Sequence, residues 1–139
     1  MSSRLDRCRK IELPRSSDLR GSLTFVEGGR HIPFHMQRTY WIYDVPGGEV
    51  RGGHAYRTLE EFVIALSGSF EVELDDGEER RTVLLNRSYY GLYVPALIWR
   101  QLKNFSTNSV CLIAASAVYD EGDYLREYPD FLAAVKPEP

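Results

Sequence analysis

The chain has 139 residues, of which 43% are hydrophobic and 12% aromatic, and its formal net charge is -3 at pH 7. That length suits one domain with an ordinary hydrophobic core and is short for two, and the aromatic content excludes a disordered chain. The slightly acidic balance excludes a nucleic-acid-binding protein that works through overall positive charge.

Two further features concern the cellular compartment. No run of about 18 apolar residues is present, so we expect no membrane span, and the charged stretch 1–10 lacks the apolar segment of a secretory signal. Cys8 stands among charged residues and Cys111 in an apolar run. We therefore expect reduced thiols in a cytoplasmic protein, with Cys111 packed in the core.

Turn-forming residues divide the chain at regular intervals, and short segments rich in β-branched and aromatic residues lie between them. Many short strands separated by turns about 8–12 residues apart are typical of an all-β sandwich or barrel. We expect a single domain over residues 1–139, with the barrel at about 21–117. The predicted strands are 22–26, 39–45, 62–66, 70–74, 81–85, 92–95, 98–105 and 110–116.

The clearest hairpin lies in the middle of the chain. Residues 62–66 are continuously apolar, which predicts a buried strand, and residues 69–74 alternate between apolar and polar. The alternation predicts that Phe70, Val72 and Leu74 face the core.

Only the tail changes period. Apolar residues recur at helical spacing within about 120–136, and Pro129 is expected to separate two short helices that cover an edge or an end of the barrel. The acidic residues within 120–126 are expected to cap the start of the first helix.

The segment from Gly48 to Gly68 carries the most informative spacing: a Gly, five residues, His54-Ala-Tyr56, four residues, Glu61, six residues and a Gly. It resembles the first motif of the cupin superfamily, except that Tyr56 replaces the second histidine. The resemblance implies a cupin-type β-barrel or jelly roll. Because alternate residues of a strand share a face, His54 and Tyr56 should both point into the barrel. Glu61 should return on the adjoining strand.

A second cupin-like segment runs from Pro95 to Asn104, and Arg100 stands where this motif places a ligand histidine. A guanidinium cannot coordinate a cation and repels one at contact distance. One imidazole and one carboxylate, from His54 and Glu61, are too few for a dedicated transition-metal site. We therefore predict a barrel with no metal and no other cofactor.

Cationic and aromatic side chains indicate the ligand class. Arg51, Arg57 and Arg100 lie on or beside the inward-facing strands, and arginine forks suit phosphate oxygens. Aromatic residues cluster in the same segments and can stack on a base or a sugar. Most of them are expected in the core, with Tyr40 and Tyr93 as the exceptions that contact ligand. Phosphate and ring binding together predict a nucleotide-linked sugar.

Five segments together closely resemble the dTDP-4-oxo-6-deoxyglucose 3,4-ketoisomerases, within a similarity that extends over about 21–131. They are residues 38–44, 51–57, 91–95, 99–102 and 119–126. The resemblance implies cofactor-free cupin homodimers with exchanged strands, which move the carbonyl of a dTDP-linked 4-oxo-6-deoxyhexose from C4 to C3 during 3-amino-6-deoxyhexose synthesis.

The same resemblance implies roles for single residues. His54 would carry a proton between C3 and C4, Arg51 would approach the nucleotide phosphates, and Tyr40 would lie near the sugar. Tyr56 departs from the family, which usually has a second histidine there. A phenol with a pKa of about 10 is a poor base unless shifted, but its hydroxyl can donate to the substrate or act as an acid.

Several alternatives stay open at this point. The chain resembles the members that form galacto products at Arg20 and those that form gluco products at Arg100. Glu61 is counted with the binding residues, but we favour a structural pair between Glu61 and an arginine. The function can also be that of a sugar-nucleotide 3,5-epimerase, although no Asp is spaced to support His54, or of a non-catalytic sugar-nucleotide-binding cupin.

Overall fold

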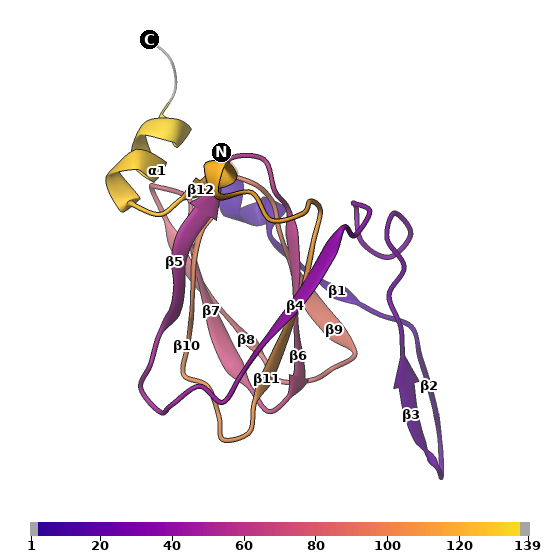
Figure 1. The fold of residues 1–139 in the computed structure, drawn as a ribbon. Helices are drawn as coiled ribbons and strands as arrows, with labels where there is room; N and C mark the ends of the chain where they lie inside the picture. The colour runs from indigo at the N-terminus through magenta and orange to yellow at the C-terminus, as the bar shows by residue number, and fades with distance from the viewer. Residues whose placement is uncertain (1–2, 137–139) are drawn as a thin grey trace.

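The computed structural model describes residues 3–136, which form two antiparallel five-stranded sheets that face each other (Figure 1). The first sheet has the order β1 (Arg9–Glu12), β9 (Tyr90–Val94), β6 (Glu61–Ser67), β11 (Val110–Ala115) and β4 (Arg38–Tyr43). The second has the order β12 (Tyr124–Leu125), β5 (Arg51–Tyr56), β10 (Trp99–Lys103), β7 (Phe70–Asp75) and β8 (Arg80–Leu85). The predicted all-β jelly roll is confirmed. Residues 1–2 and 137–139 of the predicted domain lie outside the described residues.

Alternation along the strands builds the core between the sheets. Phe70, Val72 and Leu74 of β7 are fully buried, as predicted, and face the core. The apolar strand β6 is buried on both faces from Phe62 to Ala65, whereas Leu66 at its end is 46% exposed. A strand that is covered on both sides needs no polar face. The buried strand predicted from the apolar run 62–66 is therefore confirmed up to Ala65.

Strand β1 was not predicted, because its sequence is mainly charged. It pairs antiparallel with β9, with Arg9 opposite Tyr93 and Lys10 opposite Leu92, so the sheets begin near Arg9 rather than near Gly21. Strand β1 is an edge strand, and its cations lie over the tyrosine rings of β9: Arg9 over Tyr93 and Lys10 over Tyr90. Cation–π contacts of this kind leave no apolar pattern in the sequence.

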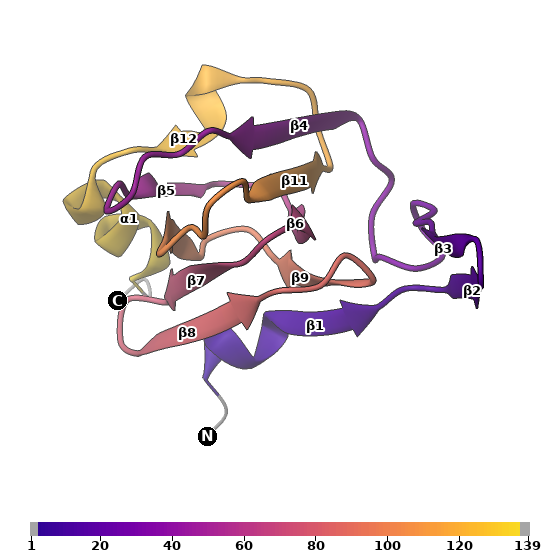
Figure 2. The ribbon, with the colours of Figure 1, turned by 90° about the horizontal axis from the view of Figure 1, so that it is seen from below.

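A two-stranded hairpin of β2 (Arg15–Asp18) and β3 (Gly21–Thr24) stands apart from both sheets (Figure 2). Its strands are almost entirely exposed, and β2 was not predicted because its residues are polar. The hairpin and the residues beside it expose Leu19, Leu23 and Phe25.

The tail differs from the prediction of two helices. A 3-10 turn (Glu121–Asp123) leads into β12, and a single helix α1 (Tyr128–Val135) follows. Pro129 lies in the first turn of α1, where a missing N–H costs nothing, so it begins the helix rather than separating two. Helix α1 covers the end of the second sheet, where Phe131 packs on Leu125 and Ala55 (Figure 1).

The cysteines behave as expected for reduced thiols. Cys8 and Cys111 are both free and buried, and both belong to the core cluster between the sheets, which confirms the core position of Cys111. Within residues 3–136, the one α-helix is too short to cross a membrane.

Gly91 of β9 offers a test of how tightly the first sheet is packed. A Cβ at this position would collide with the buried Phe62 ring on the neighbouring strand β6. We expect Gly91→Ala to lower the free energy of unfolding by about 1–3 kcal/mol, as overpacking does. Gly47→Ala is the control, because no atom lies within 4 Å of a Cβ there. Urea unfolding measures the free energy of unfolding of both variants. Equal values for Gly91→Ala and Gly47→Ala would contradict the tight contact between Gly91 and Phe62.

Candidate active site

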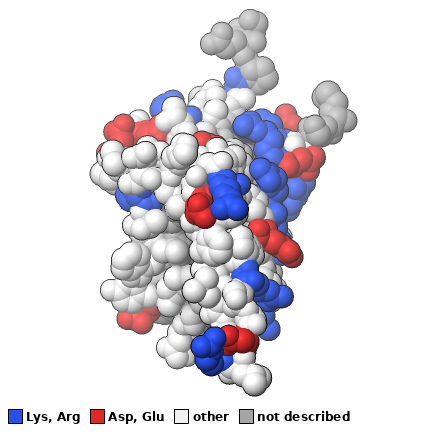
Figure 3. Space-filling model, turned by 90° about the vertical axis from the view of Figure 1, so that its right-hand side faces the viewer, with Lys and Arg blue, Asp and Glu red and all other residues white. Residues whose placement is uncertain are grey.

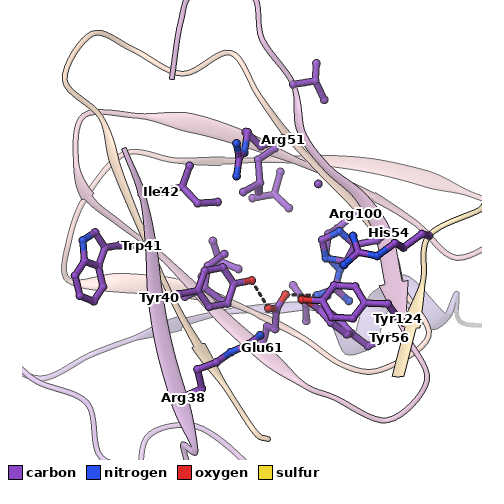
Figure 4. A pocket seen from close by; sticks show the side chains of 18 residues that line it. Arg38, Tyr40, Trp41, Ile42, Arg51, His54, Tyr56, Glu61, Arg100 and Tyr124 are labelled. Carbon is purple, nitrogen blue, oxygen red and sulfur yellow. Dashed lines mark hydrogen bonds and ion pairs between the residues drawn. The ribbon is translucent and has the colours of Figure 1, made fainter. Parts of the chain in front are cut away.

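A cavity of about 570 Å³ lies between the two sheets (Figure 4). Its inner wall is apolar and formed by Val63, Val72, Val94, Leu102 and Ile113. The polar side chains come mainly from β4, β5, β10 and the C-terminal segment: Arg38, Tyr40, Arg51, His54, Tyr56, Glu61, Arg100, Tyr124 and Arg126. An apolar wall with a few convergent polar groups is the usual form of a small-molecule site.

A bulge in β5 brings Arg51 and His54 to the same face. Strict alternation would point residues 51 and 54 to opposite faces. The register against β10 shifts, because Arg100 is opposite His54 and Gln101 is opposite Gly52. Gly52 and Gly53 have φ of 99° and 76°, a backbone region that side chains other than glycine rarely adopt. The two glycines therefore allow Arg51, His54 and Tyr56 to line one cavity.

A buried ion pair joins the two sheets across the cavity. Nη1 of Arg100 donates to Oε1 of Glu61 at 2.5 Å, and the hydroxyl of Tyr40 donates to Oε2 at 2.6 Å (Figure 4). The side chains of Arg100 and Glu61 are 4% and 1% exposed. Glu61 lies on β6 in the sheet opposite β5, so it faces His54 from across the interior and does not sit on a strand adjoining β5.

The remaining donors of Arg100 are also used. Its Nε and Nη2 donate to the carbonyl oxygen of Ile98 at 3.2 Å and 2.9 Å. Arg100 is thus neutralised by Glu61 and held by backbone, so the expected pairing of Glu61 with an arginine is present. A guanidinium fixed in this way has little capacity left for a ligand phosphate.

His54 lies between β10 and the C-terminal segment. Its ring contacts the rings of Tyr56 and Tyr124, with centroids 4.9 Å and 5.3 Å apart. Its Nε2 is buried and has no hydrogen-bond partner among residues 3–136. Burial, followed by the charges of Arg100 and Arg126, lowers the pKa of His54 from 6.5 to about 3. The imidazole is therefore neutral at physiological pH and can accept a proton.

The tyrosines of the cavity are proton donors, in contrast to the proton-accepting imidazole of His54. Burial and the nearby Glu61 carboxylate raise the pKa of both Tyr40 and Tyr56 well above the usual value. The Tyr56 hydroxyl is buried and has no hydrogen-bond partner among residues 3–136. Both phenols therefore stay protonated, and Tyr56 is suited to donate a hydrogen bond or a proton rather than to act as a base.

Two of the predicted binding residues lie outside the cavity. Leu92 and Val94 of β9 face the interior, so Tyr93 points to the other face, where it donates to Glu60 and packs beside Phe34. Arg57 follows the end of β5 and is exposed. Arg20, the position tied to product configuration, is at the tip of the β2–β3 hairpin and pairs with Asp18.

Three of the polar cavity residues named above were not among the predicted site residues: Arg38, Tyr124 and Arg126. Arg38 directly precedes the predicted strand 39–45, and β4 in fact begins at Arg38, so alternation with Tyr40 extended by one residue was a sufficient signal for it. Tyr124 and Arg126 were placed in a helix start, and a strand of two residues is too short to reveal its period. Contacts with β5, which the tail sequence does not encode locally, give this segment its extended form.

The donor set does not fit a metal ion. Of the cupin ligand positions only His54 and Glu61 carry ligating groups, and Glu61 is paired with Arg100. No group of three or more His, Cys, Asp or Glu that could hold a metal occurs within residues 3–136.

The chain is similar to known sugar-nucleotide enzymes. A family model described as FdtA, WxcM-like, C-terminal matches residues 6–136. The chain is 40% identical over 121 residues, 87% of each sequence, to the TDP-4-oxo-6-deoxy-alpha-D-glucose-3,4-oxoisomerase of Aneurinibacillus thermoaerophilus.

Solved structures agree with this similarity. The 3,4-ketoisomerase QdtA of Thermoanaerobacterium thermosaccharolyticum, as a histidine-to-asparagine variant with TDP-4-keto-6-deoxyglucose, gives a TM-score of 0.90 at 34% identity over 92% of this chain and 93% of that one. A 3,4-ketoisomerase of Helicobacter canadensis gives 0.89 at 38% identity, over 92% and 96%. A dTDP-4-dehydrorhamnose 3,5-epimerase of Bacillus anthracis, 13% identical with a TM-score of 0.76 over 89% and 80%, shares the fold alone.

The buried pair provides a test of the cavity's construction. Glu61→Gln leaves the Arg100 guanidinium buried without a counter-charge, and we expect it to lower the free energy of unfolding by about 3–5 kcal/mol. The double variant Glu61→Leu/Arg100→Met removes both charges and should be more stable than Glu61→Gln. Guanidinium unfolding of the three proteins measures this; a double variant less stable than Glu61→Gln would contradict it.

Proposed function

The chain belongs to the FdtA family of WxcM-like proteins, as its motifs predicted, and we propose on that basis that it is a dTDP-4-oxo-6-deoxyglucose 3,4-ketoisomerase. It moves the carbonyl of the sugar nucleotide from C4 to C3, in the cytoplasm, for the synthesis of 3-amino-6-deoxyhexoses. The observation that carries the proposal is the half-buried, neutral His54, whose buried Nε2 is unpartnered within residues 3–136 and lies in a cavity with protonated phenols.

The reaction needs one base and one or more hydrogen-bond donors. His54 Nε2 removes the proton from C3, the C–H electron pair becomes the C3=C4 bond, and the carbonyl pair moves onto the C4 oxygen. Delivery of a proton to C4 and loss of the proton from the C3 oxygen then leave the carbonyl at C3. No atom is gained or lost overall, C3 is oxidised and C4 is reduced, and no cofactor is required.

Tyr56 is the hydroxyl donor to the substrate in this proposal, and Tyr40 has a supporting role beside the sugar. Tyr56 replaces the imidazole usual in the family and donates to the sugar oxygen that becomes negative, since its phenol is protonated and unpartnered within residues 3–136. Tyr40 is already bound to Glu61, so it positions the carboxylate and packs against the sugar. Glu61 and Arg100 serve as the scaffold of the cavity.

Arg51 binds the nucleotide phosphates. It lines the cavity, is exposed to solvent, and forms no ion pair with the other residues of the described part of the chain. An unpaired guanidinium at the mouth of a cavity can form charge-assisted bonds with two phosphate oxygens. Arg57 follows the opposite end of β5 from Arg51 and does not line the cavity, so we assign it no contact with the ligand.

The epimerase alternative has less support. A 3,5-epimerase would need an Asp to orient the histidine, and the residues that line the cavity include no Asp. The non-catalytic alternative predicts binding without exchange of carbon-bound hydrogen, which the experiment below measures.

The proposed enzyme is a homodimer with exchanged strands. The outer side of the first sheet exposes Trp41, Tyr43 and Leu66, and the hairpin bears exposed Leu19 and Leu23. Figure 3 views the molecule from the hairpin side, where charged side chains are sparse over much of the surface. Strand β4 has a hydrogen-bonded neighbour on only one side within the described residues. Two copies that exchange hairpins would cover these surfaces and the strand edge.

Incubation with dTDP-4-oxo-6-deoxyglucose in D₂O tests the activity, with NMR of the product. We expect a 3-oxo product that carries deuterium at C4, and recovered substrate that carries deuterium at C3. The coupling constants of the product assign the gluco or galacto configuration. His54→Asn should lower turnover by about 10²–10⁴-fold, the usual contribution of general-base catalysis, with little change in dTDP affinity. His35→Asn, an exposed loop histidine, is the control.

Three results would contradict the proposal. Exchange at C3 and C5 without a 3-oxo product would indicate the epimerase, and tight dTDP binding with no exchange would indicate the non-catalytic protein. Full activity of His54→Asn would assign the base to another residue.

Light scattering after gel filtration tests the dimer. We expect the mass of two chains for the native protein and of one chain for Leu23→Asp, which places a charge on the hairpin surface. Leu84→Asp is matched to it, because Leu84 is also exposed but lies on β8 of the second sheet. A native monomer, or a dimer that survives Leu23→Asp unchanged, would contradict this interface.

A further inference from the structure

The C-terminal segment adds a second strand beside His54. Strand β12 pairs with β5, with Tyr124 opposite Tyr56 and Leu125 opposite Ala55. Tyr124 lines the cavity, and Leu125 points to the other side, where it packs with Phe131. The next residue, Arg126, again lines the cavity. The antiparallel register places it beside His54, on the side of β5 away from Arg100.

Hydrogen bonds to the β5–β6 connection hold this segment in place. Asp123 accepts from the backbone N–H of Thr58 and Leu59 at 3.0 Å each, and from Oγ1 of Thr58 at 2.9 Å. Its carbonyl oxygen accepts from the N–H of Arg57 at 2.9 Å. The backbone that carries Arg126 is therefore positioned without help from the ion pair of Arg126 itself.

The two guanidiniums beside His54 differ in what they can still bind. Arg100 is buried and uses its donors on Glu61 and on backbone carbonyls. Arg126 lies 4.1 Å above the Tyr124 ring and donates through Nε and Nη2 to Glu121, at 2.5 Å and 2.8 Å. Both members of this second pair are about half exposed, at 52% and 55%. Exposed pairs of this kind contribute little, so Arg126 can turn toward an anion in the cavity.

We propose that Arg126 is a catalytic residue of the ketoisomerase, whose guanidinium stabilises the negative charge on the sugar oxygens of the enediolate. This inference rests on the proposed function. The charge develops on O4 when the C3 proton leaves, and a cation next to the base is next to that oxygen as well. The half-exposed Arg126 retains an unused Nη1 with which to donate. Hydrogen-bond donors directed at developing charge commonly contribute more to catalysis than any other single effect.

The same placement explains how a weak base can be sufficient. Positive charges beside an imidazole make it a poorer base, because they disfavour the imidazolium. Those charges also lower the energy of the enediolate, which makes the C3 hydrogen more acidic. The base, His54 on β5, and the group that stabilises the anion, Arg126 directly after β12, are therefore neighbours on paired segments.

Steady-state kinetics of four variants test the proposal. We expect Arg126→Gln to lower kcat by about 10²-fold, with KM and dTDP affinity changed by less than about threefold. Arg126→Lys keeps the charge and should recover about a tenfold part of that loss. Glu121→Gln removes the same ion pair but leaves the guanidinium, so it should stay within about threefold of the native enzyme. Arg30→Gln is the control for the charge change, because Arg30 lies in an exposed loop and pairs with Glu27.

The outcomes separate the possible roles. Equal losses in Arg126→Gln and Glu121→Gln, together with equal losses of thermal stability, would show that Arg126 only fixes the segment and would overturn the proposal. A loss of dTDP affinity with unchanged kcat would make Arg126 a phosphate ligand and would also overturn it. Absence of turnover by the native protein in the same assay would overturn the proposed ketoisomerase function. A loss of turnover confined to the Arg126 variants would leave that function standing.

Discussion

Glu61 and Arg100 meet in the interior of the jelly roll, from strands of opposite sheets, where either charge alone would be costly. Their pairing holds the two sheets at the cavity and fixes the Tyr40 hydroxyl on the carboxylate. It also places the Arg100 guanidinium beside His54 while its donors are used on Glu61 and on backbone rather than on a ligand. The chemistry of the cavity follows from this arrangement.

As a consequence, the cavity holds one group that accepts a proton, the His54 imidazole, and several groups that donate. His54 stays neutral because burial and neighbouring guanidiniums disfavour its charged form. Tyr56 stays protonated because burial and the carboxylate of Glu61 disfavour its phenolate. Proton transfer between adjacent carbons of an α-hydroxy ketone needs one group that accepts a proton and another that donates one. Beside His54 this chain has the protonated phenol of Tyr56, which is suited to donate a proton rather than to remove one.

Alternation and glycine spacing predicted much of the fold and part of the site. The period of two placed Phe70 and Val72 in the core, and the motif around His54 located the cavity. The unpredicted parts depend on contacts between distant segments. Strand β1 pairs with β9 and lays its cations over tyrosine rings, and β12 owes its extended form to β5, so neither has a local signature. Tyr93 was misplaced because the face of a short strand depends on its register.

The protonation state of the His54 imidazole is the most direct test of this division between acceptor and donors. Heteronuclear NMR of the imidazole nitrogens, with His54→Asn to assign the resonances, follows its protonation in the ligand-free protein. We expect His54 to remain neutral at pH 5, far below the ordinary histidine pKa of about 6.5. A titration midpoint at or above 6.5 would contradict this, because the ring would then lie in solvent or beside a negative charge rather than between two guanidiniums.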